Sequence, residues 1–274
     1  MVFLPNRNVD IADESARLYG AWLSTIEERL DDPSCDRYEL CRSVLMEIHH
    51  PELVGVDPQT LPLSTQVLLA QMDARSVTLE PEYYAEADLE RYDLTKPLIW
   101  MWEGFDRSAL GENVHLGVKF RRMLAKRIFR SCGKHFKAFH HVKLSFGYNM
   151  DVGDNVVVHR HVLLDDRGGI QLGDGASISD FANIYSHSHD LVEGRDITTP
   201  MTVIGAGVRI TYHATVMSGV HVADGTMLGS FGMATRDTDP ESVYAGIPAK
   251  KIRDKPARAR PPATLDPLAE DEET

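Results

Sequence analysis

The residues best suited to chemistry stand together near the middle of the chain, where residues 183–190 have the sequence NIYSHSHD. The stretch offers two imidazoles, His187 and His189, and the carboxylate of Asp190. Imidazole titrates near neutral pH, so a histidine can serve as a general base, and clustered histidines can also bind a metal ion. This composition predicts a proton-transfer site, with a metal site as the competing interpretation.

Residues 183–190 interrupt a long series of six-residue repeats. A fixed period of six with an apolar residue at one position is typical of a parallel β-helix, in which each repeat supplies a short strand and a corner. We expect these apolar residues to point into a narrow stacked core. Residues 190–203 carry no repeat and predict a loop held by a rigid solenoid, where functional residues are common. The repeat positions are Phe146, Val152, Val158, Leu164, Leu172, Ile178 and Ile184 before this loop, and Ile204, Ile210, Val216, Val222 and Leu228 after it.

The repeats divide the chain into three parts. Residues 1–133 predict an α-helical N-terminal region, residues 134–253 a β-helix, and residues 254–274 a disordered tail that is rich in proline and alanine and then acidic. Apolar residues at helical spacing predict helices near residues 18–30, 38–49 and 64–73. We find no catalytic motif in this N-terminal region, which could cap the β-helix, contact another subunit or form a wall of the acceptor site.

A basic amphipathic helix is predicted over residues 116–130. No acidic residue occurs between Glu112 and Asp151, whereas lysine and arginine are frequent there, and the apolar residues of the helix share one face. Such a helix could cover the open end of the β-helix, present a surface to an acidic acceptor or to phosphates, or lie on an anionic membrane. We expect the cap and no membrane contact.

Length, charge and cysteine content limit the class of protein. The chain has 274 residues and a formal net charge of -12, which argues against general nucleic-acid binding. Its three cysteines suggest no disulfide framework, so reduced thiols in a cytosol are expected. The N-terminus lacks a signal-peptide pattern, and no apolar run is long enough to span a bilayer. We therefore expect a cytoplasmic protein.

Residues from about 140 to 253 resemble the hexapeptide-repeat acyltransferases, and the pattern is most similar to galactoside and maltose O-acetyltransferases. Three features carry the resemblance: the repeats, the SHSHD stretch followed by a loop and TVIG at residues 202–205, and the ending VYAGIPAKKIR at residues 243–253. This ending is similar to the AGxPAKxIR motif of the family. The resemblance implies a left-handed parallel β-helix, a homotrimer with active sites between subunits, and acetyl-CoA or another acyl-CoA as co-substrate.

The resemblance also implies which histidine is catalytic. In the family this residue lies five positions after an apolar repeat position and just before the loop, and counting from Ile184 reaches His189. Its implied role is that of a general base, which takes the proton of an acceptor hydroxyl while that oxygen attacks the thioester carbonyl. His187 is expected on the same side of an extended strand, as a substrate-binding or hydrogen-bonding neighbour rather than an essential group.

Other candidate residues match family positions that contact the two substrates. On the acceptor side, Ser145 and Asp166 match sugar-binding positions, although Asp165 and Asp166 could equally form a solvated corner turn. Val158 replaces an acceptor-contacting asparagine of the family, so the acceptor stays open. Cations at the cofactor positions suit the phosphates of CoA. The cofactor candidates are Arg209, in place of a tryptophan beside the CoA site, Ser230, Thr235, Arg236, in place of a lysine, and Lys250 and Arg253 of the closing motif.

Two competing functions remain after this comparison. A metal-dependent enzyme of the carbonic-anhydrase type could use His159 and His161 together with the histidines of residues 187–190. The characteristic histidine spacing and HisGlyCys element of that class are absent, so we expect no metal ligand. A non-enzymatic scaffold or binding protein would need neither His189 nor the basic ending. We therefore predict a CoA-dependent O-acyltransferase that acetylates a sugar or glycan-like hydroxyl.

Overall fold

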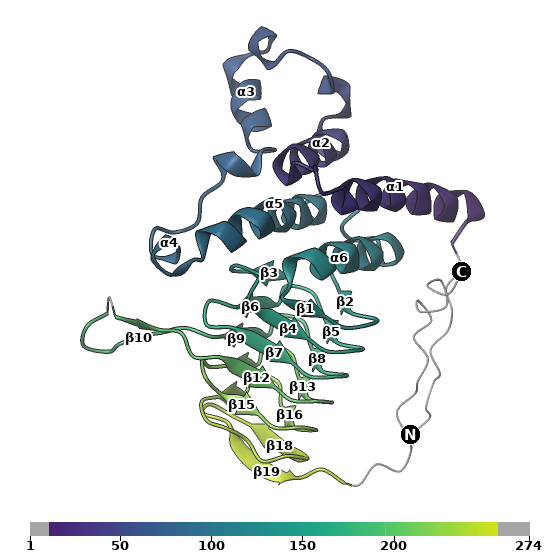
Figure 1. Ribbon diagram of the computed structural model, residues 1–274. Coiled ribbons are helices and arrows are strands. Elements are labelled where there is room, and N and C mark those ends of the chain that lie inside the picture. Colours follow the sequence, from purple (N-terminus) through teal and green to yellow (C-terminus); the bar gives the residue numbers. More distant parts are fainter. Residues whose placement is uncertain (1–10, 195, 257–274) are drawn as a thin grey trace.

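The computed structural model describes residues 11–194 and 196–256, and the tail expected to be disordered lies almost entirely outside them. A layer of α-helices rests on one end of a parallel β-helix (Figure 1). The three helices predicted near the N-terminus are present as the first three of this layer. The helices are α1 (Asp13–Asp31), α2 (Arg37–His49), α3 (Leu63–Ala70), α4 (Tyr83–Glu86), α5 (Leu89–Asp106) and α6 (Val114–Ile128), with 3-10 turns at Pro51–Leu53, Pro58–Thr60 and Ala74–Ser76.

The β-helix consists of three parallel sheets that the chain visits in turn, which confirms the predicted fold class. The first sheet contains β1 (Ser131–Cys132), β4 (Met150–Val152), β7 (Ile170–Leu172), β12 (Thr202–Ile204) and β15 (His221–Val222). The second contains β2 (Lys137–Ala138), β5 (Val157–Val158), β8 (Ser177–Ile178), β13 (Arg209–Ile210), β16 (Met227–Leu228), β18 (Ser242–Ala245) and β19 (Lys250–Asp254), of which β19 is antiparallel. The third contains β3 (Lys143–Leu144), β6 (Leu163–Asp165), β9 (Asn183–Tyr185), β14 (Thr215–Val216) and β17 (Met233–Ala234).

The repeat positions stack in register to form the core. Leu164 pairs with Ile184 across β6 and β9, and Ile184 pairs with Val216 across β9 and β14, and all three side chains are buried. The expectation for Phe146 is wrong, because its ring packs in a separate cluster with Tyr92 and Tyr148. Leu144 takes its place in the third sheet, since residues 145–149 form a longer corner that carries Phe146 outward to the helical layer.

The predicted cap is confirmed for α6. Its apolar residues Leu116, Phe120 and Leu124 are buried in the same core cluster as the strands, and the helix contacts β1 and β2 (Figure 1). It therefore covers the open end of the β-helix. No helix in the described part of the chain is long and apolar enough to cross a membrane.

Two arginines of α6 depart from the expected basic outer face. Arg121 and Arg122 are buried, with 1% and 5% of their surface exposed. The guanidinium of Arg121 donates to the carboxylate of Asp106 at 2.9 and 2.5 Å and to the carbonyls of Ala138 and Gly111. This buried ion pair joins the end of α5, helix α6 and the first turn of the β-helix.

Candidate active site

The candidate site lies where the chain passes from the third sheet to the first. Three successive connections meet there: residues 145–149, residues 166–169 and residues 186–201. Because β3, β6 and β9 are stacked in register, these connections lie one above another. The last one contains the antiparallel hairpin β10 (Ser188–His189) and β11 (Ile197–Thr198), which projects from the β-helix (Figure 1). This is the loop that the interrupted repeat predicts.

Asp165 orients His187. The carboxylate of Asp165 is buried and forms a hydrogen bond with Nδ1 of His187, while it accepts a second bond from Oγ of Ser145 at 2.8 Å. The hydroxyl of Ser186 donates to the backbone carbonyl of Asp165 at 2.5 Å. His187 is thus held in one orientation by a buried acid.

Asp166 and Ser145, the two candidates for sugar binding, are both buried and form hydrogen bonds within the protein. Asp166 is fully buried, and its carboxylate accepts backbone N–H groups of Ser145 at 3.0 Å, Phe146 at 2.9 Å and Asn149 at 3.3 Å. It therefore holds the corner of residues 145–149. This corresponds to the corner turn considered as an alternative to sugar binding, except that the carboxylate is buried rather than solvated. Ser145 is 6% exposed and its hydroxyl is engaged by Asp165. Neither side chain faces solvent where an acceptor could reach it.

His189 has the geometry of a general base. Its Nδ1 lies 2.9 Å from the carbonyl oxygen of Gly194 within the same hairpin. Since a carbonyl can only accept, Nδ1 must carry the proton, and this leaves the lone pair on Nε2. Nε2 lies 3.8 Å from Oε1 of Glu82, and the side chain as a whole is 41% exposed. The ring stands nearly perpendicular to that of His187, with 5.5 Å between centroids.

The helical layer contributes to this site through Glu82 and α4. Arg167 donates to Glu82 at 2.8 Å and to Glu86 at 2.7 Å, and its guanidinium lies 4.5 Å from the ring centre of Tyr83. The hydrogen bond from Arg167 lowers the pKa of Glu82, so this carboxylate beside His189 is ionised. The N-terminal region therefore borders the candidate site.

Tyr83 closes the site from the same side. Its ring packs edge-on against Phe146 at 5.8 Å between centroids. Burial raises the pKa of Tyr83, and the nearby Asp165 adds to this effect, whereas a hydrogen bond with Ser145 opposes it. The phenol is therefore protonated and polar, next to the Asp165 and His187 pair.

The base of the hairpin depends on Gly168. A Cβ atom at this position would lie 2.3 Å from the carbonyl oxygen of Thr199 and 2.4 Å from that of Ser186. Only glycine allows the two ends of the connection to approach so closely. The hydroxyl of Ser186 accepts the N–H of Gly168 at 2.8 Å and completes this fixed base.

The sequence missed Glu82, Tyr83, Arg167 and Gly168 as parts of the site. Glu82 and Tyr83 lie in a part of the chain that shows no motif, so no local signal marks them. Asp165 is predicted only as part of a corner turn, although the repeat itself carries a signal for it: Asp165 follows Leu164, which pairs with Ile184 three residues before His187.

The cofactor candidates are all exposed but fall on two parts of the surface. Thr235 and Arg236 directly follow β17 of the third sheet, at the same corner as the His189 connection. Arg209, Lys250 and Arg253 lie on strands of the second sheet, and Ser230 follows β16 of that sheet, with its hydroxyl 3.4 Å from that of Thr211. A single chain therefore does not bring this second group together with His189.

Known sequences that are similar to the chain are named acetyltransferases. The chain is 26% identical over 141 residues to the galactoside O-acetyltransferase of Escherichia coli K12, a match that covers 50% of this chain and 70% of that protein. It is 27% identical over 113 residues to a putative acetyltransferase of Staphylococcus aureus, covering 39% of this chain and 56% of that protein. No family model matches the chain.

Solved structures share the β-helix. A galactoside acetyltransferase in complex with coenzyme A superposes with a TM-score of 0.55 at 23% identity, over 65% of this chain and 91% of the other. A maltose O-acetyltransferase from Clostridium difficile gives a TM-score of 0.55 at 21% identity, over 63% and 91% of the two chains. At these identities the superpositions establish the fold. Together with the sequence matches, they confirm that the chain resembles the hexapeptide-repeat acyltransferases and has their β-helix fold.

Proposed function

We propose that the protein transfers an acetyl or other short acyl group from acyl-CoA to a hydroxyl group of a sugar or glycan-like acceptor. The observation that carries this proposal is the geometry of His189. Its Nδ1 donates to the Gly194 carbonyl, so in the neutral ring Nε2 is left as a proton acceptor on a side chain that is 41% exposed. Named acetyltransferases among the relatives support the same reaction.

The reaction follows from this geometry. The acceptor hydroxyl binds against Nε2 of His189, which removes its proton as the oxygen attacks the thioester carbonyl carbon. The C–S bond then breaks, and the CoA thiolate leaves and takes the proton back from the imidazolium. Because a thioester is already activated, the transfer needs no nucleophilic residue of the protein. Glu82 carries a negative charge beside the ring and can stabilise the imidazolium while it exists.

The acceptor is proposed to enter between the hairpin and α4. Glu82 is 37% exposed there and can accept hydrogen bonds from hydroxyl groups, whereas Arg167 behind it is buried and fixes its orientation. His187 borders the same opening and is 17% exposed. A polyhydroxylated acceptor suits such a wall of hydrogen-bond acceptors and donors.

The CoA site is proposed to form between subunits of a homotrimer. Cofactor candidates on the second sheet lie away from His189 within one chain, so a neighbouring copy would have to supply them. Their cations and hydroxyls suit the phosphates of CoA in an otherwise acidic protein. The proposed residues are Arg209, Ser230, Thr235, Arg236, Lys250 and Arg253.

Release of free thiol from acetyl-CoA tests the proposed function. We expect thiol release that depends on a hydroxylated acceptor, measured over a panel of mono- and oligosaccharides, and a trimer mass by light scattering. A non-enzymatic scaffold would give no release above background with any acceptor. A metal-dependent enzyme would lose activity after chelation, so the assay is repeated on metal-free protein purified without a histidine tag.

Substitution of Arg236 or Arg253 tests the cofactor positions. Both side chains are exposed, and neither is paired within residues 11–194 and 196–256. We expect Arg236→Ala and Arg253→Ala each to raise the KM for acyl-CoA about fivefold or more, because a charge-assisted phosphate contact is lost, with little change in kcat.

Arg42→Ala is the control for these substitutions, since it removes an arginine of α2 in the helical layer whose side chain is 43% exposed. The KM for acyl-CoA should be unchanged in this variant. If KM stays unchanged in Arg236→Ala and Arg253→Ala as well, these residues do not hold the cofactor.

A further inference from the structure

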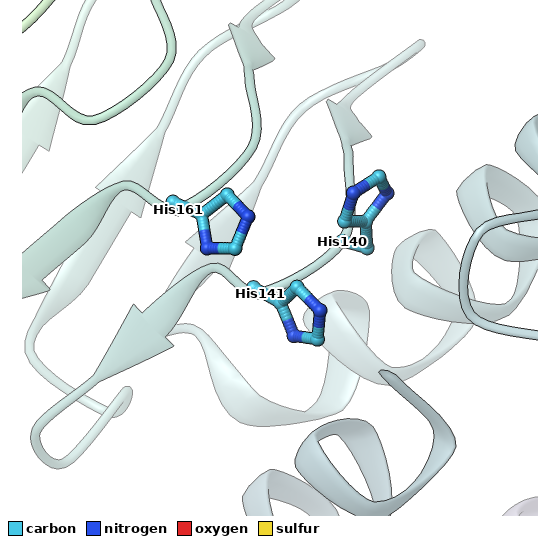
Figure 2. A group of neighbouring side chains, drawn as sticks. All are labelled: His140, His141 and His161. Carbon is cyan, nitrogen blue, oxygen red and sulfur yellow. The ribbon is translucent and has the colours of Figure 1, made fainter. Parts of the chain in front are cut away.

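A second group of histidines lies outside the candidate active site. His140 and His141 form the corner between β2 and β3, and His161 occupies the equivalent corner one turn later, between β5 and β6. One ring nitrogen from each of the three lies within 4.8 Å of the others. Figure 2 shows the three rings on three sides of a common space. We propose that His140, His141 and His161 bind a divalent transition-metal ion, with Zn²⁺ as the reference ion.

The backbone holds these rings in place. His141 and His161 have φ angles of 62° and 56°, in the left-handed region, and the N–H of His161 donates to the carbonyl of His140 at 3.2 Å. The N–H of His141 donates to Asp106 at 2.7 Å, and this carboxylate belongs to the buried ion pair with Arg121. The corner is thus fixed from below by the β-helix and from above by α5. To bind an ion, only the three histidine side chains have to rotate, and the backbone can stay where it is.

Stacking of aromatic rings along one corner of the β-helix is an alternative explanation, but it accounts for only part of the histidine cluster. The same corner position carries Phe181, His213 and Phe231 in later turns, where neighbouring rings stack almost parallel, at 2° to 4° and 4.8 to 4.9 Å. His161 joins this ladder through Phe181. His141, however, is tilted by 31° against His161, and His140 stands outside the ladder with its ring at 89° to that of His141. Ring stacking therefore explains neither His140 nor the convergence of the three nitrogens.

The ligand chemistry favours zinc, nickel or copper. Imidazole nitrogen suits these ions, whereas magnesium and calcium prefer oxygen. Ligand nitrogens around a tetrahedral zinc ion are roughly 3.4 Å apart, given bond lengths of about 2.0 to 2.1 Å. The rings therefore need to rotate inward by a small amount to close on the ion. His161 is exposed, which gives the ion access and leaves a fourth position for water.

The bound ion would join the first two turns of the β-helix beneath the end of α5. Binding to the folded protein alone raises its stability, so the site would fasten the end of the β-helix on which the helical layer rests. This role is independent of the proposed acyl transfer. The active-site histidines form a separate group with Glu82, and the test has to distinguish the two.

The test is titration of Zn²⁺ into tag-free, chelator-treated full-length protein, measured by calorimetry. We expect one zinc ion per chain and a rise in the unfolding temperature. His161→Asn should weaken binding at least tenfold, whereas His213→Asn should not. The two variants are matched, because both histidines have positive φ at the same corner position and asparagine tolerates that conformation, but His213 belongs to no such cluster among the described residues.

Further variants decide the remaining outcomes. His140→Gln, at a residue without positive φ, should weaken binding like His161→Asn and replaces that variant if it does not fold. The double variant His187→Ala/His189→Ala should keep full zinc binding. The proposal is overturned if no zinc binds, if His161→Asn and His140→Gln both bind zinc like the native protein, or if binding is lost in the double variant, which would place the ion in the active site.

Discussion

His189→Ala is expected to lower the turnover of acyl transfer by roughly 10²- to 10⁴-fold, which is the usual contribution of a positioned general base. The imidazole is the group whose Nε2 is free to accept the proton, since Nδ1 is committed to the Gly194 carbonyl. Because the side chain is 41% exposed, its removal should leave the unfolding temperature and CoA binding unchanged. Thiol release, calorimetry with CoA and thermal unfolding measure these three quantities.

The matched comparison for this prediction is His187→Ala. This neighbouring imidazole is engaged by Asp165, so its loss should reduce turnover much less than the loss of His189. Near-native turnover in folded His189→Ala, or a larger loss in His187→Ala, would move the base to the Asp165 and His187 pair.

The sequence predicts those parts of the fold in which each residue type is required by its immediate neighbours along the chain. Each turn of a β-helix needs an apolar residue at a fixed spacing, so the core from Val152 to Leu228 can be read from its period, and an interruption marks the hairpin. Phe146 fits the period by chance and belongs to another cluster, because longer corners between repeats change the spacing. The choice of His189 comes from the resemblance to the family, which places its histidine a fixed number of positions after a repeat residue, and its catalytic role stays a prediction.

The rest of the site depends on contacts that no local pattern records. Glu82 meets His189 only because the helical layer folds back over the end of the β-helix, and Arg167 pairs with Glu82 and Glu86 across the same boundary. The basic face of α6 shows the same limit. Arginines on an amphipathic helix predict a solvated surface. The buried partner of Arg121 is Asp106, which lies on another helix, so the sequence of α6 alone does not reveal the pair.

Arg121→Met is expected to lower the free energy of unfolding by about 3 to 5 kcal/mol, because it leaves the buried carboxylate of Asp106 without its partner. Asp106 is 4% exposed and Arg121 is 1% exposed, so water cannot replace the lost ion pair. Two backbone carbonyls, of Ala138 and Gly111, also lose a donor. Denaturant unfolding at neutral pH measures the change. Arg107→Met is the control, since it breaks an exposed pair with Glu103 and should cost at most about 1 kcal/mol.

The pH dependence of Arg121→Met separates a lost charge partner from lost packing. Burial raises the pKa of Asp106, and Arg121 opposes this effect, so the pKa should rise further in the variant. When the pKa of a group is higher in the folded than in the unfolded protein, protonation stabilises the folded state. This stabilisation is complete at a pH below the unfolded-state pKa and is lost as the pH rises through the folded-state pKa. The difference in unfolding free energy between Arg121→Met and the native protein should therefore become smaller toward acidic pH.

The double variant Arg121→Met/Asp106→Asn should regain part of the lost stability at neutral pH, because no buried charge remains and the asparagine still accepts the N–H of His141. A difference that is independent of pH and no recovery in the double variant would show that Arg121 contributes packing rather than charge.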